Sequence, residues 1–513
     1  MAQLRVPPRD REDEQPNHSR IWYLNRLATG ASLGLVGRGL GRGLHVIAFV
    51  VAARELGPGP FGVLALGWTV FRFASLIGTV GLDKAVVRFG AGKGRGRVIV
   101  AGLVGVTVSG CLTATGVVLL APWLARAVFG EPELASILRT FSIAIVAYGI
   151  MRVCTQATLL EKDVKWSLAI EEGAQPATEL ATVTLAAVTG AGVLITAMGL
   201  SVSYVLASFV AMVVVITGFL PSRSDIRVDL AELQRLALYG LPASASAILV
   251  MSMFWMDKLL LGALGDTSDV GLYQSASQLP MALALVAGSF GTIVRPLLAD
   301  LYERADAVGL RLVYRAATKW LLLLIGPIIV PMLIMPRTVL EAVFGSSFTT
   351  GYVALAILAG CHLVNVGVGL SGIALNMTDN HRAYVKLTAS GTGVAVVGNV
   401  LLIPVYGVTG AAIGTGGGLL VLAVGSFLLL KRRLGFEIRD IGFVGPCAAI
   451  ASAVALASLG TRGLDLHGAA ERLTFALVAS GATVTGVSMW VGFDDEERDV
   501  LVTLVRGMGG NGV

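Results

Sequence analysis

Long apolar stretches separated by short polar segments dominate the pattern of residues along this chain. A window of about 19 residues finds fourteen such stretches, each near 20 residues or longer. At a rise of about 1.5 Å per residue, each could cross roughly 30 Å of hydrocarbon as a helix. We therefore predict about fourteen transmembrane helices. The expected spans are 32–53, 60–81, 98–122, 137–158, 166–189, 192–220, 239–262, 272–299, 318–336, 352–376, 384–404, 408–430, 441–460 and 472–492.

Composition agrees with an all-α polytopic membrane protein. Hydrophobic residues make up 55% of the 513 residues and charged residues only 14%, whereas an ordinary soluble domain carries about 25% charged residues. The mean hydropathy is +0.78. This excludes a soluble enzyme of several domains. It also argues against nucleic-acid binding, because the net charge of +6 is spread over short loops rather than gathered in one patch.

The distribution of basic residues predicts the orientation. With the amino terminus in the cytoplasm, the inner segments hold 27 lysines and arginines and the outer loops hold six. Such a bias is typical of segments that stay on the cytoplasmic side. We expect a multi-pass protein of the cell membrane with both termini cytoplasmic.

A weak internal repeat predicts two lobes. The tetrapeptide Ala-Val-Phe-Gly occurs at 127–130 and again at 342–345, each time before an even-numbered span. An offset of six spans gives the two halves the same orientation, with a site expected between them. The predicted organisation is a cytoplasmic tail, a lobe of helices 1–6, a cytoplasmic linker, a lobe of helices 7–12, helices 13–14 and a second tail. These segments cover 1–31, 32–220, 221–238, 239–432, 441–492 and 493–513.

Three motifs, in this order, resemble one family of transporters. They are Ala-Arg-Glu-Leu-Gly-Pro-Gly-Pro-Phe-Gly at 53–62, the segment 257–273 with its Leu-Gly and Gly-Leu-Tyr, and Asn-Val-Leu-Leu-Ile-Pro at 399–404. The chain resembles, over about 30–435, the Wzx-type polysaccharide biosynthesis proteins. These are lipid-linked oligosaccharide flippases of the multidrug/oligosaccharidyl-lipid/polysaccharide exporter superfamily.

The resemblance implies a fold and a function. The fold would be two six-helix lobes, often with two further helices. The function would be to move an isoprenoid-phosphate- or diphosphate-linked oligosaccharide from the inner to the outer leaflet by alternating access. Such a protein is a transporter rather than an enzyme and needs no cofactor. Its partners would be membrane lipids, a glycan polymerase or ligase, and a coupling ion, H⁺ or Na⁺.

Three arginines in the first two spans are candidates for binding a phosphate or diphosphate. Arg38 and Arg42 are four residues apart on one helical face, and Arg72 could lie at a depth similar to that of Arg42. Charges inside the membrane are costly, which makes them functional candidates. The planar guanidinium suits bidentate phosphate binding. The alternative is that they extend to the membrane interface, which fits Arg38 well and Arg72 poorly.

Carboxylates in the fifth and seventh spans have several open interpretations. Glu172 and Glu179 share a helical face and could be counter-ions for the arginines, bind the coupling ion, or be solvated residues at a cavity mouth. Asp257 is either a functional carboxylate of the second lobe or part of a local interhelical hydrogen bond.

The eighth span supplies further substrate-binding candidates. Gln274 and Gln278 share one face and could contact sugar hydroxyls. Arg295 either faces the cavity or extends to the inner interface. The sequence holds no histidine or cysteine spacing typical of a metal site.

Other functions remain open at this point. A cation-coupled multidrug exporter of the same superfamily would need an acidic, aromatic site for organic cations. A peptidoglycan-precursor flippase would be essential for growth. A scaffold or scramblase that does not transport need not retain charges inside the membrane.

Overall fold

A computed structural model describes residues 39–91, 94–161, 164–219, 230–368, 370–378, 380–436, 450, 452–456 and 468–491. Over these residues every regular element is a helix. Residues 39–56 form the first helix. The principal helices that follow are α2 (Pro58–Thr79), α3 (Leu82–Phe89), α4 (Arg95–Trp123), α5 (Leu134–Thr158), α6 (Val164–Leu168), α7 (Gln175–Val188), α8 (Gly192–Gly218), α9 (Leu230–Leu264), α10 (Thr267–Glu303), α11 (Ala307–Ile334), α12 (Pro336–Phe344), α13 (Tyr352–Gly367), α14 (Ser371–Met377), α15 (His381–Leu434) and α17 (Ala469–Val491).

The all-α membrane fold is confirmed. Among the described residues, eight helical segments are long and apolar enough to cross a membrane. One of these segments, α15, contains a turn at Gly407, whose φ of 50° is not helical. Glycines after the turn pack against the helix before it, because a Cβ on Gly410 or Gly418 would overlap the backbone of Leu402 or Gly391. The label α15 therefore covers two antiparallel helices, as the spans 384–404 and 408–430 predicted. The total of fourteen stays a prediction.

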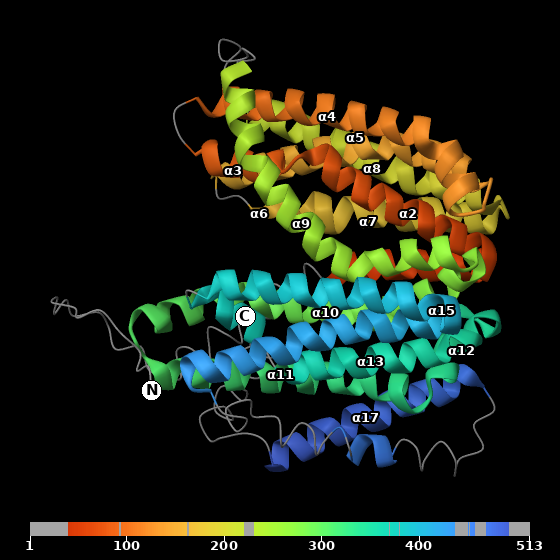
Figure 1. Ribbon diagram of the computed structural model, residues 1–513, viewed down its shortest axis with the longest axis vertical. Helices are drawn as coiled ribbons and strands as arrows, with labels where there is room; N and C mark the ends of the chain where they lie inside the picture. The colour runs from red at the N-terminus through yellow and green to blue at the C-terminus, as the bar shows by residue number, and fades with distance from the viewer. Residues whose placement is uncertain are drawn as a thin grey trace, which may run out of the picture.

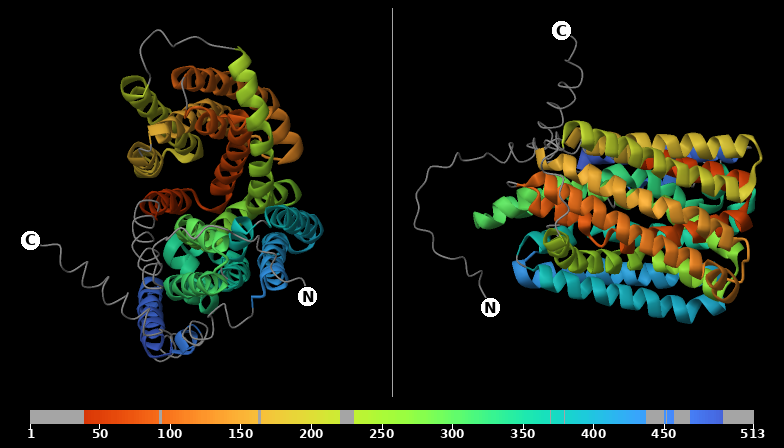
Figure 2. Two further views of the ribbon diagram at one scale, coloured as in Figure 1. Left: turned by 90° about the vertical axis from the view of Figure 1, so that its left-hand side faces the viewer. Right: turned by 90° about the horizontal axis from the view of Figure 1, so that it is seen from above.

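The helices form two lobes (Figure 1). Elements α2 to α8 gather in one bundle, the N-lobe, and α10 to α17 gather in the other, the C-lobe. The view along the helices separates the same two bundles (Figure 2). Helix α9 runs between them, contacting α3 in the N-lobe and α15 in the C-lobe. It begins at Leu230, inside the segment expected to be a linker.

Helices α2 and α10 hold the lobes together where α2 begins, which we call the Pro58 end. A Cβ on Gly62 would overlap the carbonyl of Thr267, and one on Gly271 would overlap the carbonyl of Pro58. The missing side chains let the two backbones touch. Three hydrogen bonds between described residues also cross between the lobes here, one of them from Arg54 to the carbonyl of Ala342. The Arg54 guanidinium donates to the carbonyl of Val343 at 2.7 Å, and the Thr267 hydroxyl donates to Glu131 at 2.7 Å.

At the opposite end, the Thr79 end, α9 is attached to the N-lobe. Lys84 Nζ donates to the carbonyl of Ala243 at 3.2 Å, and the Ser244 hydroxyl donates to the carbonyl of Leu76 at 3.2 Å. The glycines Gly81 and Gly240 allow this close approach, because a Cβ on either would overlap the other backbone. Helix α9 thus links the lobes along their length.

The glycine contact between α2 and α10 leads to a stability prediction. Gly62→Ala should lower the free energy of unfolding by about 1–3 kcal/mol, because the added methyl group has no room and must displace a backbone. The measurement is the midpoint of thermal unfolding in detergent. The control is Gly116→Ala in α4, where a Cβ would meet no atom within 4 Å. Equal midpoints for the two variants would contradict the close contact.

Candidate binding cavity between the lobes

A cavity lies between the lobes, with an empty volume of about 1060 Å³ when its open mouth is included. The first helix, α2, α5 and α8 contribute side chains from the N-lobe, and α9 and α10 contribute the opposite wall. Five of the predicted residues line it, from both sides: Arg42, Arg72, Glu172, Gln274 and Gln278. A cavity therefore lies where the site was expected, and predicted residues from both of its sides line it.

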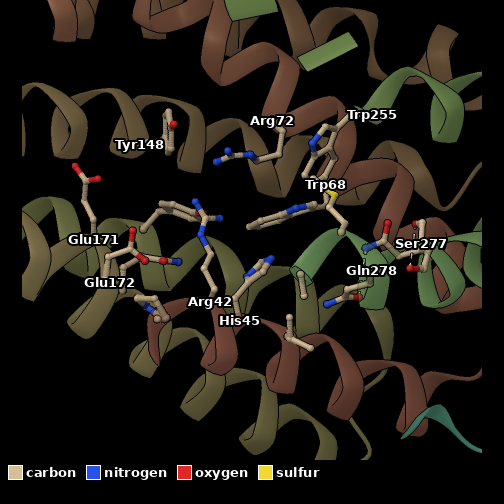
Figure 3. Close-up of a pocket in the computed structure, with 18 of the residues that line it drawn as sticks. Arg42, His45, Trp68, Arg72, Tyr148, Glu171, Glu172, Trp255, Ser277 and Gln278 are labelled. Carbon is tan, nitrogen blue, oxygen red and sulfur yellow. Dashed lines mark hydrogen bonds between the residues drawn. The ribbon is translucent and has the colours of Figure 1, made fainter. Parts of the chain in front are cut away.

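Arg42 and Arg72 are the cations of the cavity that have no acidic partner among the described residues. No described carboxylate lies within 4 Å of either guanidinium. Arg42 is exposed to the cavity, and the Arg72 guanidinium carbon lies 5.3 Å from the centroid of the Tyr148 ring. Both side chains point into the same space (Figure 3). An aromatic face stabilises a cation without neutralising it, so both charges stay available to an anionic ligand.

A third arginine of the cavity, Arg152 on α5, is neutralised. It donates to Asp83 at 3.0 Å and to Glu171 at 2.8 Å, and the Thr155 hydroxyl donates to Glu171 as well. Glu171 and Glu172 lie in a π-helical segment, Ala169–Ala174, that precedes α7. Such segments often occur at functional sites. The Arg152 contacts fix this segment against α3 and α5 at the edge of the cavity.

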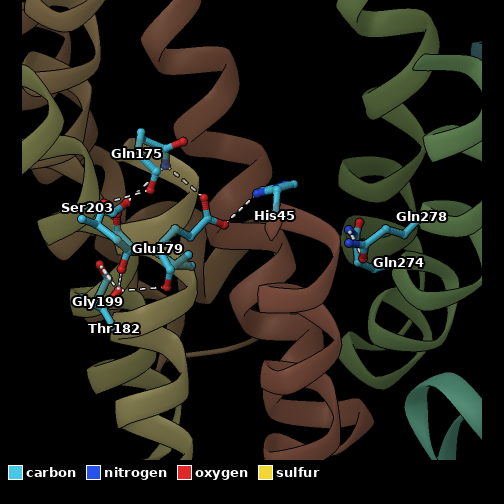
Figure 4. A network of polar contacts seen from close by, with 10 residues as sticks. His45, Gln175, Glu179, Thr182, Gly199, Ser203, Gln274 and Gln278 are labelled. Carbon is cyan, nitrogen blue, oxygen red and sulfur yellow. Dashed lines mark hydrogen bonds and ion pairs between the residues drawn. The ribbon is translucent and has the colours of Figure 1, made fainter. Parts of the chain in front are cut away.

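Glu179 is fully buried beside the cavity and pairs with a histidine instead of an arginine. His45 Nδ1 lies 2.7 Å from Glu179 Oε1, and the Gln175 amide donates to Oε2 at 3.0 Å (Figure 4). The same amide lies 3.3 Å from the Ser203 hydroxyl on α8. The contacts join the first helix, α7 and α8. In this conformation Glu179 therefore has a partner other than the predicted arginines.

Amides and an aromatic ring line the C-lobe wall. The Gln274 amide donates to Gln278 at 3.5 Å, a weak contact that leaves most of both amide groups unpaired with each other. Trp255 and Lys258 on α9 complete this wall, with the lysine Nζ 4.6 Å from the Trp255 ring. Amides and an indole ring can contact sugar hydroxyls and the apolar faces of sugar rings. The two walls therefore differ in chemistry, with free guanidinium groups opposite amides.

The remaining predicted residues lie away from the cavity or outside the described residues. Asp257 is buried among helices and accepts hydrogen bonds from Tyr273 at 2.5 Å and Thr415 at 3.1 Å. This geometry matches its interpretation as an interhelical hydrogen bond. Arg295 is exposed and does not line the cavity. Arg38 lies outside the described residues.

Sequence reasoning missed two residues of this site. Arg152 was available as an arginine within a predicted span, and its charge was the signal. His45 lies one turn after Arg42 on the first helix, but only the contact with α7 reveals its role. The Trp68 ring lies 5.5 Å from His45 within a cluster with Phe49, Phe71 and Tyr204. It also lines the cavity, so it both packs the N-lobe and forms part of the wall.

Residues 51–352, more than half of the chain, match the family described as polysaccharide biosynthesis protein. The chain belongs to this family. The match covers every described element of the N-lobe after residue 50, all of α9 and the start of the C-lobe. It confirms the family resemblance carried by the sequence motifs.

Two curated relatives come from the archaeon Haloferax volcanii. The chain is 26% identical over 161 residues to the probable low-salt glycan biosynthesis flippase Agl15, which covers 31% of this chain and 34% of that protein. It is 28% identical over 187 residues to the probable flippase AglR, covering 35% and 38%. The chain thus spans about a third of the length of the curated relatives it matches.

Solved structures confirm the fold. The Lipid II flippase MurJ, in an inward closed conformation, superposes with a TM-score of 0.72 at 14% identity, over 92% of this chain and 100% of that chain. An inward-facing MATE family multidrug transporter gives 0.66 at 15% identity, over 78% and 98%. A transporter of the same superfamily from Pyrococcus furiosus, described as having a binding pocket of reverse polarity, gives 0.57 at 18%, over 81% and 96%.

The Arg152 contacts lead to a second stability prediction. Arg152→Gln should lower the free energy of unfolding by roughly 1–3 kcal/mol, because it leaves the partly buried carboxylates of Asp83 and Glu171 without their cation. The control is Arg139→Gln, an exposed arginine on the same helix, which should change stability by less than about 0.5 kcal/mol. Thermal unfolding in detergent measures both. If the two variants unfold alike, the Arg152 contacts contribute nothing.

Proposed function

We propose that this protein is a flippase that carries an isoprenoid-phosphate- or diphosphate-linked oligosaccharide across the membrane for surface polysaccharide assembly. The observation that carries the proposal is the pair of free guanidinium groups, Arg42 and Arg72, in a cavity between two lobes. The named relatives Agl15 and AglR are described as probable flippases, which supports the same activity here. The activity is transport and not catalysis.

The charge of the cavity favours an anionic substrate. Four of its lining residues are lysine or arginine and two are glutamate, and Glu171 is already paired with Arg152. An exporter of organic cations would need an excess of acidic groups instead. The phosphate would lie between Arg42 and Arg72, and the glycan would contact Gln274 and Gln278 on the opposite wall. Lipid-linked glycan is thus a better match than a cationic drug.

The direction of transport follows from the loop charges. With both termini in the cytoplasm, the Thr79 end faces the cytoplasm and the Pro58 end faces outward. The contact between α2 and α10 then closes the outer side. In this state the substrate would be loaded from the inner leaflet of the cell membrane. A glycan polymerase or ligase outside the cell would consume the product.

The His45–Glu179 pair is our candidate for proton coupling. An imidazole and a carboxylate in direct contact can share one proton and release it when the pair separates. Because the pair joins the first helix to α7 beside Arg42, a change in its protonation would alter the wall that holds the phosphate. Arg42 and Tyr204 line the same cavity as His45, and the Gln175 amide contacts both Glu179 and Ser203.

Removing the two free guanidinium groups should abolish transport. In cells deleted for the gene, Arg42→Ala/Arg72→Ala should leave lipid-linked oligosaccharide on the cytoplasmic leaflet, whereas wild type relieves the accumulation. Leaflet-resolved quantification of the lipid measures this. The control, Arg126→Ala/Arg139→Ala, removes two exposed N-lobe charges outside the cavity and should transport normally. Transport by the cavity variant at the wild-type rate would refute the phosphate site.

The absence of any accumulation in the deletion strain would refute the flippase function itself. Altered sensitivity to cationic dyes would then favour the multidrug branch, and loss of viability would favour a peptidoglycan precursor as substrate.

Neutralising Glu179 should remove the dependence of transport on a pH gradient. In proteoliposomes, wild type should flip a short polyprenyl-diphosphate glycan faster with a pH gradient across the membrane than without one. The rate of Glu179→Gln should be the same in both conditions, because the glutamine cannot bind the proton. Glu303→Gln, at the exposed end of α10, is the control. A response of wild type to a sodium gradient, and none to pH, would contradict proton coupling.

A further inference from the structure

A second hollow lies beside the central cavity, between α2, α3 and α9. Its empty volume is about 890 Å³ with its open side included. Helix α9 supplies its apolar floor through Ala247, Val250, Met251 and Phe254, and Leu76 of α2 adds to it. We call this hollow the α2–α9 groove. Val250 is 48% exposed, so the floor is open to the surroundings of the bundle.

The groove and the central cavity share a wall. Arg72 and Trp255 line both of them. Figure 3 shows the two side chains next to each other at one side of the cavity. Each comes from a different helix, Arg72 from α2 and Trp255 from α9. Side chains can change rotamer in far less time than helices move. The Arg72 and Trp255 side chains therefore lie between the groove and the cavity.

The groove combines an apolar floor with two cations at different heights. Lys84 lies at the Thr79 end, is exposed, and is fixed to α9 through the carbonyl of Ala243. Arg72 lies about two turns inside α2 from that end. A hydrocarbon chain could lie along the floor while its phosphate passes from Lys84 to Arg72. This charge pattern fits an anionic lipid and would not attract a neutral one.

A lipid-linked glycan presents a geometric requirement that the groove meets. Its glycan and phosphate need the polar cavity, but moving the hydrocarbon chain out of lipid into that cavity would cost about 0.8 kcal/mol per CH₂ group. The chain must therefore stay in an apolar surrounding while the phosphate is inside. An opening between the apolar surrounding and the polar cavity has to lie at the depth of the residue that binds the phosphate. Arg72 is such a ligand and lines both spaces.

We propose that the isoprenoid chain of the substrate lies in the α2–α9 groove during loading, with its phosphate at Arg72, and that the Arg72–Trp255 wall opens to admit it. This inference rests on the proposed function, because it assumes a lipid-linked substrate. It assigns a lateral entry path on the α9 side of the molecule. Bulk phospholipid is the competing occupant, and the experiment below separates the two.

The first test labels the groove directly in the wild-type protein. A polyprenyl diphosphate with a photoreactive group in its chain is added to the purified protein in phosphatidylcholine vesicles, and labelled peptides are identified by mass spectrometry. We expect labels on α9 between Ala247 and Phe254, and competition by unlabelled polyprenyl diphosphate. Photoreactive phosphatidylcholine should label this segment less. Equal labelling by both lipids, or polyprenyl labels elsewhere, would overturn the proposal.

The second test fills the groove. Val250→Trp should lower the rate of flipping on the order of tenfold, because the indole ring occupies space that the chain needs. Ala247→Phe, one turn away on the same floor, should act alike if Val250→Trp fails to fold. The control is Val397→Trp, which places the same side chain at a 58% exposed position of α15.

The outcomes separate this inference from the proposed function. If wild type flips the lipid and the groove variants do so at the wild-type rate, the entry path is wrong and the flippase function stands. If wild type does not flip the lipid, the proposed function fails first. Folding of every variant is checked by its unfolding midpoint.

Discussion

The rest of the structure depends on the backbone contact between α2 and α10 at the Pro58 end. Gly62 and Gly271 face carbonyl groups of the opposite helix, so the two lobes touch without intervening side chains. This contact fixes the lobes at one end and leaves space between them farther along α2, where Arg72 lies. A larger residue at either glycine would separate the helices and change the cavity that they bound. The position of the site is thus set by two residues that are not part of it.

Charges inside the membrane are stabilised in two different ways in this molecule. Arg152 has two carboxylate partners, and Glu179 has an imidazole and an amide, so neither depends on a ligand. Arg42 and Arg72 have no described acidic partner and remain hydrated or bind an anion. An unpaired cation at this depth costs free energy. The unpaired arginines are consequently the positions where a ligand would contribute most.

Much of the fold could be predicted from the sequence, and less of the site. Apolar runs indicated the helices, because the hydrophobicity of a segment can be read from that segment alone. The short repeat around Ala-Val-Phe-Gly indicated the two lobes. Charge within a span also identified Arg42 and Arg72. The partner of Glu179 could not be predicted, since His45 is 134 residues away and meets it only through the packing of the first helix on α7. The same limit hid the neutralisation of Arg152.

Alternating access requires the Pro58 end to open, and the contacts there indicate how. Besides the glycines, the lobes are joined at this end by hydrogen bonds of Arg54 and Thr267 and by the edge-to-face contact of the Phe61 and Phe348 rings. Hydrogen bonds at an exposed end exchange with water at a small net cost of about 0.5–1.5 kcal/mol each. The Phe61 and Phe348 rings are fully buried and would lose this packing when the lobes separate. By contrast, α9 contacts both lobes over its length and could stay attached while they rotate. Opening of the Pro58 end would therefore cost the packing of these two rings in addition to the hydrogen bonds, while α9 keeps the lobes connected.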